Sequence, residues 1–301
     1  MILINFAGME LLDGKIASAA LKQSLKQKID NLIQSGKRVP HLAAVLIGDD
    51  PASHTYVNSK VKNCKEIGIQ STLITHGSSI TEGELLSIVK DLNNRENVDG
   101  ILVQVPLPSH ISENKVTLAI DPEKDVDGFH PVNVGNMVLG LPGFVSATPL
   151  GILLLLQHYN ISAGGKRVVV VGRSHTVGTP ISILLSRNTS FGNATVTLCH
   201  SRTRDLPAIC READILVAAI GRPLFITSDM VKDGAVIVDV GINRVEDPGA
   251  KRGFRLKGDV DFENVKEKCS YISPVPGGVG LMTIAALLQN TYDAYIRRAN
   301  R

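Results

Sequence analysis

The feature that most constrains the fold is an alternation, along the whole chain, of short apolar runs and segments with helical periodicity. Apolar runs of about four to eight residues bounded by turn formers are typical of strands buried on both faces. Their alternation with helices predicts an α/β fold with mostly parallel sheets. Strands are expected at 42–47, 71–75, 100–105, 167–171, 195–198, 215–220 and 235–240, and helices at 16–32, 53–67, about 282–298 and from residues 81, 148 and 177.

The length of 301 residues predicts two domains, because domains average about 150 residues. Residues 122–149 are rich in Gly, Pro and Asn and have little periodicity, which is typical of a binding loop or a domain junction. A second α/β set is expected to begin at Thr148-Pro149, where an N-cap residue precedes a proline at the first helical position.

The composition excludes several classes of protein. With 44% hydrophobic and 20% charged residues, the chain is neither disordered, collagenous nor a coiled coil. Only 4% of the residues are aromatic and none is Trp, which argues against a platform on which bases stack. The 32 basic and 29 acidic residues leave a net charge of +3, so no nucleic-acid partner is expected.

The sequence also predicts a cytoplasmic location. The four cysteines have no zinc-ligand spacing, so no metal is expected, and they are interpreted as core residues in a reducing cytosol. The segment MILINFAGMELLDGK lacks the features of a signal peptide. The longest apolar run, at 150–156, is far shorter than the roughly 20 residues that a bilayer requires, so no membrane partner is expected.

The strongest local signal for a ligand is the segment from Gly172 to Gly178, which follows an apolar run and precedes a helix expected from about Val177. A strand, a glycine turn and a helix N-terminus together form the context that binds a dinucleotide pyrophosphate. The spacing G-x-S-x-x-x-G departs from G-x-G-x-x-G, so glycines that only shape the turn remain an alternative.

The next expected strand distinguishes between the two nicotinamide cofactors. NAD sites usually have a carboxylate at the end of this strand, whereas here the strand leads into His200-Ser201-Arg202. Together with Arg173, these residues suit a 2′-phosphate, although ordinary exposed basic residues are the alternative. The sequence therefore favours NADP.

Polar residues in the first half suggest a second site. Tyr56 and Lys60 are four residues apart on an expected helix and therefore share a face. They are interpreted either as proton-handling groups or as an ordinary surface pair. Gln104 interrupts an apolar strand, so its side chain needs a hydrogen-bonding partner. That partner could belong to a site, or Gln104 could be a core amide with only a structural role. Asp125 and Asp127 lie among turn formers, where they either cap the chain or bind a ligand with paired N–H donors.

Six segments, in order, resemble the bifunctional 5,10-methylenetetrahydrofolate dehydrogenase/5,10-methenyltetrahydrofolate cyclohydrolase family, and the resemblance covers essentially the whole chain. The family differs from this chain in the cofactor loop, at His175, Thr176 and Thr179, and at Leu281, where proline is usual. The six segments are GDDPASHTYVNSK, GILVQVPLP, PEKDVDGFHPVNVG, VVVVGRSHTVGTP, VIVDVGIN and PVPGGVG.

The resemblance implies two α/β domains with an active-site cleft between them. The catalytic folate-binding domain would comprise residues 1–147 and 284–301, because the last helix returns to it. The NADP-binding domain, a Rossmann-type doubly wound parallel sheet, would comprise residues 148–283. The family also implies a homodimer.

The resemblance further implies the chemistry. NADP would take a hydride from the one-carbon bridge of methylenetetrahydrofolate, and water would open the methenyl ring to give 10-formyltetrahydrofolate. A monofunctional dehydrogenase of the same fold is the alternative; an unrelated hydroxy-acid or amino-acid dehydrogenase and a non-catalytic nucleotide sensor are more distant ones.

The implied catalytic set is Lys60, Tyr56, Gln104 and Asp127. Lys60 would serve hydrolysis and Gln104 would orient it, while Tyr56 would line the pterin site and Asp127 would accept two N–H bonds from the folate. Further folate contacts would be Ser53, Val105, Pro106, Pro276, Gly277 and Gly280, and the cofactor residues would be Gly172, Arg173, Ser174, Val177, Gly178, Ser201, Arg202, Gly221, Ile242 and Thr283.

Overall fold

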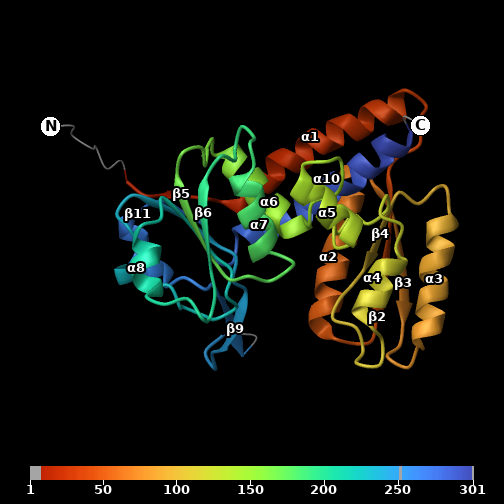
Figure 1. Cartoon of the computed structure of the whole chain (residues 1–301). Helices are drawn as coiled ribbons and strands as arrows, with labels where there is room; N and C mark the ends of the chain where they lie inside the picture. The colour runs from red at the N-terminus through yellow and green to blue at the C-terminus, as the bar shows by residue number, and fades with distance from the viewer. Residues whose placement is uncertain (1–7, 251–252, 300–301) are drawn as a thin grey trace. The chain divides into compact units, whose positions relative to one another are not determined.

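The computed structural model describes residues 8–250 and 253–299, which form two compact α/β units (Figure 1). The first unit comprises Ala19–Ala147 and the described residues from Ile284 onward. The second unit comprises Thr148–Thr283 and the described residues up to Ser18. Residues 8–18 therefore belong to the second unit, whereas the sequence analysis placed them in the first. The reason is that strand β1 (Glu10–Leu11) pairs with a strand near residue 270.

The first unit is built on a three-stranded parallel sheet of order β3-β2-β4. All seven residues of the central strand are buried, as the uninterrupted apolar run predicts. Asn290 joins the end of the chain to this unit, because its amide donates to the carbonyl oxygens of Val126 and Val145 at 2.8 and 2.9 Å. The elements are β2 (His41–Ile47), α2 (Pro51–Ile67), β3 (Gln70–His76), α3 (Glu82–Asn94), β4 (Gly100–Val103), α4 (Glu113–Ala119), α5 (Pro131–Leu139) and most of α1 (Gly14–Gln34) and α10 (Val279–Ala299), whose first residues belong to the second unit.

Local signals determine where these helices begin and end. Helix α3 begins where a helix was expected, with a capping box in which Thr81 and Glu84 bond each other's backbone N–H groups. Helix α2 begins at Pro51, two residues before the expected start, because Asp50 is its N-cap. It ends before Gly68, whose φ of 86° requires glycine.

Two helices of the first unit were not expected. Helix α4 follows an N-cap serine, and α5 occupies part of the stretch 122–149 that was interpreted as irregular. The N-cap of α5 is His130, which is not a usual capping residue, and Val132 and Leu139 are exposed on it. This helix buries Asn133 and exposes several apolar side chains, so its apolar residues do not mark the buried face and the pattern did not reveal it.

The second unit is built on a six-stranded, wholly parallel sheet of order β1-β11-β8-β7-β5-β6. Strand β5 lies between β6 and β7, so the chain winds outward in both directions from it, as in doubly wound folds. Its elements are α6 (Ala147–His158), β5 (Arg167–Val171), α7 (Gly178–Ser186), β6 (Thr195–Cys199), α8 (Leu206–Arg211), β7 (Ile215–Ala218), β8 (Ala235–Asp239), the antiparallel pair β9 (Asn243–Glu246) and β10 (Phe254–Lys257), α9 (Phe262–Val265) and β11 (Cys269–Ile272).

Several boundaries differ from those expected. Helix α6 begins at Ala147, so Thr148 lies inside its first turn and is not the N-cap. Helix α10 begins at Val279, about one turn early, and β4, β7 and β8 end before the expected residues. Strands β1, β9, β10 and β11 were not expected, because runs of two to four residues carry too little periodicity.

All four cysteines are buried and free, and burial raises the pKa of Cys64, Cys210 and Cys269 to about 12. In the described part of the chain, no helix combines the length and the hydrophobicity needed to cross a membrane. Residues 1–7, which contribute to the expectation that there is no signal peptide, lie outside the described residues.

Candidate active site

The predicted cofactor residues of the second unit lie at one edge of its sheet. Gly172 directly follows β5, and Ser201 and Arg202 follow β6. Gly221 comes soon after β7, and Ile242 soon after β8. Because the strands are parallel, their carboxyl ends meet at the same edge, which is where doubly wound folds bind ligands.

The turn between β5 and α7 leaves no room for side chains at either glycine. A Cβ atom at Gly172 would lie 2.0 Å from the carbonyl oxygen of Ala219, and one at Gly178 would lie 1.9 Å from that of Gly172. Gly172 also has a φ of 120°. The side chain of Ser174 accepts hydrogen bonds from the backbone N–H groups of Val177 and Gly178. The result is a bare backbone turn at the positive end of α7, which suits an anionic ligand.

Arg173, Ser201 and Arg202 are all exposed near this turn. Among the residues that the structure describes, neither guanidinium has an acidic partner. The backbone N–H of Arg202 donates to His200 Nδ1 at 3.1 Å, which ties the end of β6 into a turn. Two unpaired cations and a hydroxyl can satisfy a phosphate group.

The segment after β11 carries the other predicted residues of this unit. Gly277 has a φ of 113°, and a Cβ atom at Gly280 would lie 3.2 Å from Cδ1 of Ile242. The start of α10 is therefore beside Ile242, three residues after the end of β8. Thr283, on α10, lies with its hydroxyl 3.1 Å from that of Thr148.

In the first unit, Lys60 and Gln104 meet although 44 residues separate them. Lys60 Nζ donates to Gln104 Oε1 at 3.0 Å, and Gln104 Nε2 donates to the carbonyl oxygen of Val105 at 2.6 Å. This second bond turns the amide so that its oxygen faces Lys60. Tyr56 lies one turn before Lys60 and is 45% exposed, and Ser53 is buried one turn earlier.

The two aspartates in the loop before α5 have different environments. Asp125 is buried and accepts hydrogen bonds from the N–H of His130 and the amide of Asn133, so it is a structural cap. The carboxylate of Asp127 accepts no hydrogen bond from another described residue. Burial raises the pKa of Asp127 to about 6, while the positive charge of Lys60 acts in the opposite direction. Asp127 is thus free to accept hydrogen bonds from a ligand.

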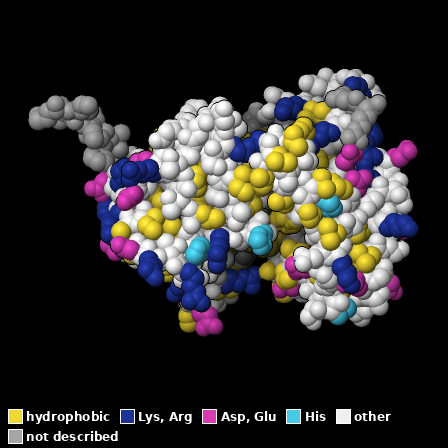
Figure 2. Space-filling model, viewed as in Figure 1, with side chains coloured by type: hydrophobic (Ala, Val, Ile, Leu, Met, Phe, Trp, Pro, Cys, Tyr) yellow, Lys and Arg dark blue, Asp and Glu magenta, His cyan; other side chains and the backbone are white. Residues whose placement is uncertain are grey.

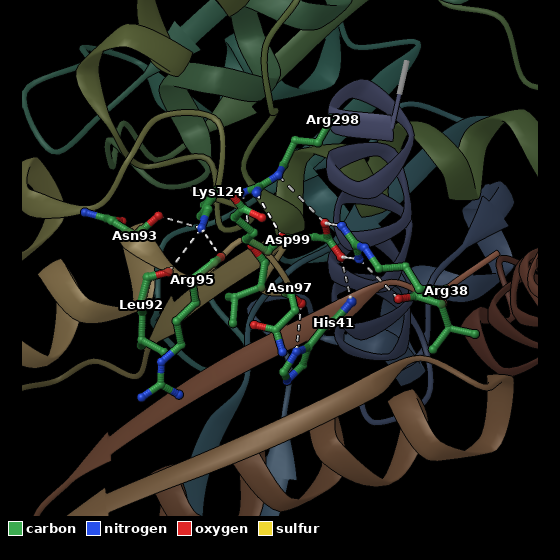
Figure 3. Close-up of polar contacts among 12 residues, drawn as sticks. Arg38, His41, Leu92, Asn93, Arg95, Asn97, Asp99, Lys124 and Arg298 are labelled. Carbon is green, nitrogen blue, oxygen red and sulfur yellow. Dashed lines mark hydrogen bonds and ion pairs between the residues drawn. The ribbon is translucent and has the colours of Figure 1, made fainter. Parts of the chain in front are cut away.

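A lysine that the sequence analysis did not single out supports this loop. The side chain of Lys124 is buried, and its Nζ donates to the carbonyl oxygens of Leu92, Asn93 and Arg95 at 2.7–3.1 Å, as Figure 3 shows. These carbonyls end helix α3, so the ammonium caps its negative end. The backbone carbonyl of Lys124 accepts from the N–H of Ile101 at 2.7 Å. The loop that carries Asp127 is therefore tied to both α3 and β4.

Beside this cap lies a second charged group, which Figure 3 also shows. Asp99 is fully buried and accepts two short hydrogen bonds from Arg38, at 2.6 and 2.7 Å, and one from the N–H of His41. Arg298, on α10, donates to the carbonyl oxygens of Glu96 and Val98. These contacts hold the start of β4 and the end of the chain together. Within the described ranges, no three acidic, histidine or cysteine side chains form a metal site.

Comparison with known families matches both parts of the chain. Residues 12–127 match the model described as "Tetrahydrofolate dehydrogenase/cyclohydrolase, catalytic domain". Residues 146–299 match the model described as "Tetrahydrofolate dehydrogenase/cyclohydrolase, NAD(P)-binding domain".

Individual relatives are similar over nearly their full length. The bifunctional protein FolD of Cytophaga hutchinsonii is 57% identical, covering 95% of this chain and 99% of the relative. A bifunctional methylenetetrahydrofolate dehydrogenase/cyclohydrolase structure from Campylobacter jejuni is 48% identical, with a TM-score of 0.90 over 97% of this chain and 100% of that chain. The Trypanosoma brucei enzyme, solved with NADP cofactor and an inhibitor, is 35% identical, with a TM-score of 0.91 over 97% and 99%.

Proposed function

Because the chain belongs to the tetrahydrofolate dehydrogenase/cyclohydrolase family, it is a bifunctional enzyme of one-carbon folate metabolism, and we propose that the residues described above carry its two reactions. The first reaction is the NADP-dependent oxidation of 5,10-methylenetetrahydrofolate to 5,10-methenyltetrahydrofolate. The second is hydrolysis of that product to 10-formyltetrahydrofolate. The observation that carries the assignment of residues is the Lys60–Gln104 hydrogen bond near the unpaired carboxylate of Asp127.

The glycine turn of the second unit fits NADP. Side chains at Gly172 and Gly178 would collide with backbone, so a pyrophosphate can approach the N–H groups at the start of α7. Arg173, Ser201 and Arg202 would hold the 2′-phosphate. When bound, NADP accepts the hydride from the one-carbon bridge, and the protein's part in this reaction is to orient the two partners. The proposed cofactor contacts are Gly172, Arg173, Ser174, Val177, Gly178, Ser201, Arg202, Gly221, Ile242 and Thr283.

Asp127 would anchor the folate. A carboxylate has two acceptor oxygens, and the aminopyrimidine edge of a pterin presents adjacent N–H donors, so a bidentate pair can form. The rigid support of this loop by Lys124 and Asp125 would keep the reacting carbon at a fixed distance from Lys60. The proposed folate contacts are Ser53, Tyr56, Val105, Pro106 and Asp127 and, by resemblance, Pro276, Gly277 and Gly280.

Lys60 would move protons during hydrolysis. Water adds to the methenyl carbon and loses a proton, and the resulting hydroxyl loses its second proton as the bond from that carbon to N5 breaks. N5 gains one proton, the formyl group stays on N10, and one proton is released overall. The hydrogen bond to Gln104 orients Lys60 Nζ, which would accept a proton from the water as the neutral amine and give one to N5 as the ammonium. A dehydrogenase without the hydrolytic step would not require this oriented pair, which argues against the monofunctional alternative.

We also propose that the protein is a cytoplasmic homodimer without a nucleic-acid partner. The buried, unpaired cysteines suit a reducing compartment. Charged side chains of both signs are spread over the face in Figure 2, which is unlike the basic stripe of a nucleic-acid binder. The dimer rests on the family resemblance. Sedimentation velocity of the purified protein, with and without a DNA oligonucleotide, tests the dimer and the absence of nucleic-acid binding.

One experiment tests the function and the cofactor together. The purified protein is incubated with methylenetetrahydrofolate and either NADP or NAD, and reduced cofactor and 10-formyl product are followed separately. We expect both products with NADP, and faster reduction with NADP than with NAD. Reduced cofactor without any formyl product would support the monofunctional alternative and remove the role proposed for Lys60.

A further inference from the structure

Two carboxylates are buried in the second unit, close to the sheet edge where the proposed cofactor residues lie. Neither has a role in the reactions described so far. Asp239 is the last residue of β8, and Asp259 lies soon after β10. Their exposed fractions are 2% and 0%. Carboxylates are rarely so deeply buried unless their oxygens are fully used, which makes their partners informative.

Asp259 binds the loops that carry two of the proposed cofactor residues. Its Oδ2 accepts hydrogen bonds from the backbone N–H groups of Ile220 and Gly221, at 2.6 and 2.8 Å. Its Oδ1 accepts from the side-chain amide of Asn243 at 2.9 Å. One side chain therefore joins the loop after β7 to the residue that follows Ile242.

Asp239 in turn holds Asp259 in place. Its Oδ1 accepts from the backbone N–H groups of Gly241 and Asp259, both at 2.9 Å, and its Oδ2 accepts from that of Val260 at 3.0 Å. The neighbouring glycines make this packing possible. A Cβ atom at Gly241 would lie 2.3 Å from Asp259 Oδ1, and one at Gly258 would lie 1.8 Å from Asp239 Oδ2.

We propose that Asp259 is a positioning residue for the nicotinamide cofactor, acting through Gly221 and Ile242. The inference rests on the proposed function, which places both residues at the cofactor. All three partners of the carboxylate lie in segments beyond the carboxyl ends of β7 and β8, where the cofactor binds. Gly221 has a φ of 72°, and Ile220 beside it packs against the core of the unit. The carboxylate fixes the backbone at Ile220 and Gly221 themselves, whereas the next backbone hydrogen bond of this loop is that of the Leu224 N–H to the carbonyl oxygen of Gly258.

The two activities of one protein supply the test, because hydrolysis of methenyltetrahydrofolate requires no nicotinamide cofactor. We compare wild type, Asp259→Ala and Asp259→Asn in dehydrogenation with NADP and in hydrolysis without it. The matched control is Asp214→Asn, because Asp214 binds the N–H of Arg167 and the ammonium of Lys232 at the opposite end of β7. NADPH fluorescence titration measures cofactor binding directly.

For Asp259→Ala we expect the KM for NADP to rise about 10- to 100-fold, as the loss of charge-assisted hydrogen bonds implies. The kcat and KM of hydrolysis stay within about twofold of wild type. Asp259→Asn keeps one acceptor oxygen for the loop, so it shows a smaller rise and partial rescue. Asp214→Asn changes neither activity.

Two results would overturn the inference. One is an unchanged KM for NADP in Asp259→Ala, and the other is a parallel fall of hydrolysis and dehydrogenation, which identifies a merely structural role. If Asp259→Ala does not fold, Asp259→Asn and Asn243→Ala carry the same comparison through the KM for NADP. A wild-type protein without either activity would instead refute the proposed function, so the two failures are distinguishable.

Discussion

Lys60 donates a 3.0 Å hydrogen bond to Gln104, whose amide is held in turn by the carbonyl oxygen of Val105. The lysine comes from helix α2 and the glutamine directly follows β4, so the pair exists only in the folded first unit. Because Gln104 is neutral, it orients the ammonium of Lys60 without neutralising its charge. That charge can therefore act on the carboxylate of Asp127 and on a substrate.

Replacing Lys60 is expected to separate the two activities. In Lys60→Met, hydrolysis of methenyltetrahydrofolate should fall about 100-fold or more, as loss of a proton-transferring group implies, while hydride transfer persists within about tenfold. Gln104→Ala should give an intermediate loss, because the lysine remains but is no longer oriented. Lys62→Met is the control, since Lys62 is exposed on the same helix. Unchanged hydrolysis in Lys60→Met would remove the proposed role.

Asp127 is expected to lower the stability of the folded protein at neutral pH, although the proposed function requires its carboxylate. Its pKa rises from 3.8 to about 6 on folding, so the folded protein binds more protons than the unfolded chain between these values. Stability therefore falls as the pH rises through this window, and the loss is complete above pH 6. Asp127→Asn should melt about 2–4 °C higher than wild type at pH 7.5, with a difference that shrinks towards pH 4.

Differential scanning calorimetry at the two pH values measures this effect. The matched control is Asp125→Asn, which disturbs the bonds to His130 and Asn133 and should lower the Tm. A Tm of Asp127→Asn at or below that of wild type at pH 7.5 would contradict the prediction. The same variant should bind folate more weakly in both reactions, because one of the two acceptor oxygens becomes an NH2 donor and the bidentate pair cannot form.

The exposed arginines are expected to determine cofactor choice. In Arg202→Ala, and more strongly in Arg173→Ala combined with Arg202→Ala, kcat/KM with NADP should fall about 10- to 100-fold and change little with NAD. Arg204→Ala is the control, because Arg204 is exposed on the same loop. Equal losses with both cofactors would show that these side chains do not bind the 2′-phosphate.

Lys124 is expected to stabilise the first unit in a pH-dependent way. Lys124→Met leaves three carbonyl oxygens at the end of α3 without their donor, which should lower the free energy of unfolding by about 1–3 kcal/mol. Burial lowers the pKa of Lys124 from 10.5 to about 8, so the unfolded chain binds more protons between these values. The wild type should therefore gain stability relative to the variant as the pH rises from 8 to 10.5. Urea denaturation at pH 7.5 and 9.5 measures both effects.

The sequence predicted those parts of the fold that depend on local patterns. The apolar run at 167–171 is β5, and the capping box at Thr81 and Glu84 opens α3. Local patterns failed for α5, which buries Asn133 and exposes Leu139, and for β1, which exists only because a strand beside it completes its hydrogen bonds. Such elements are decided by tertiary contacts that no local window contains.

The same distinction applies to the site. Glycines at 172 and 178 are visible in the sequence, because the requirement for a bare turn lies within seven consecutive residues. The pairing of Lys60 with Gln104 depends on the packing of α2 on the sheet, and only the family resemblance suggested it. Asp259 was missed because its partners lie in distant loops. The signal that remained was the placement of Asp239 and Asp259 beside Gly241 and Gly258.

The pairing of Glu10 with Tyr271 has a consequence for the order of synthesis. On a ribosome, β1 must wait for roughly 260 further residues before its neighbour exists, which takes on the order of 10–50 s at about 5–20 residues per second. The first unit waits even longer for Asn290. Neither unit can therefore be completed before this late part of the chain has been synthesised.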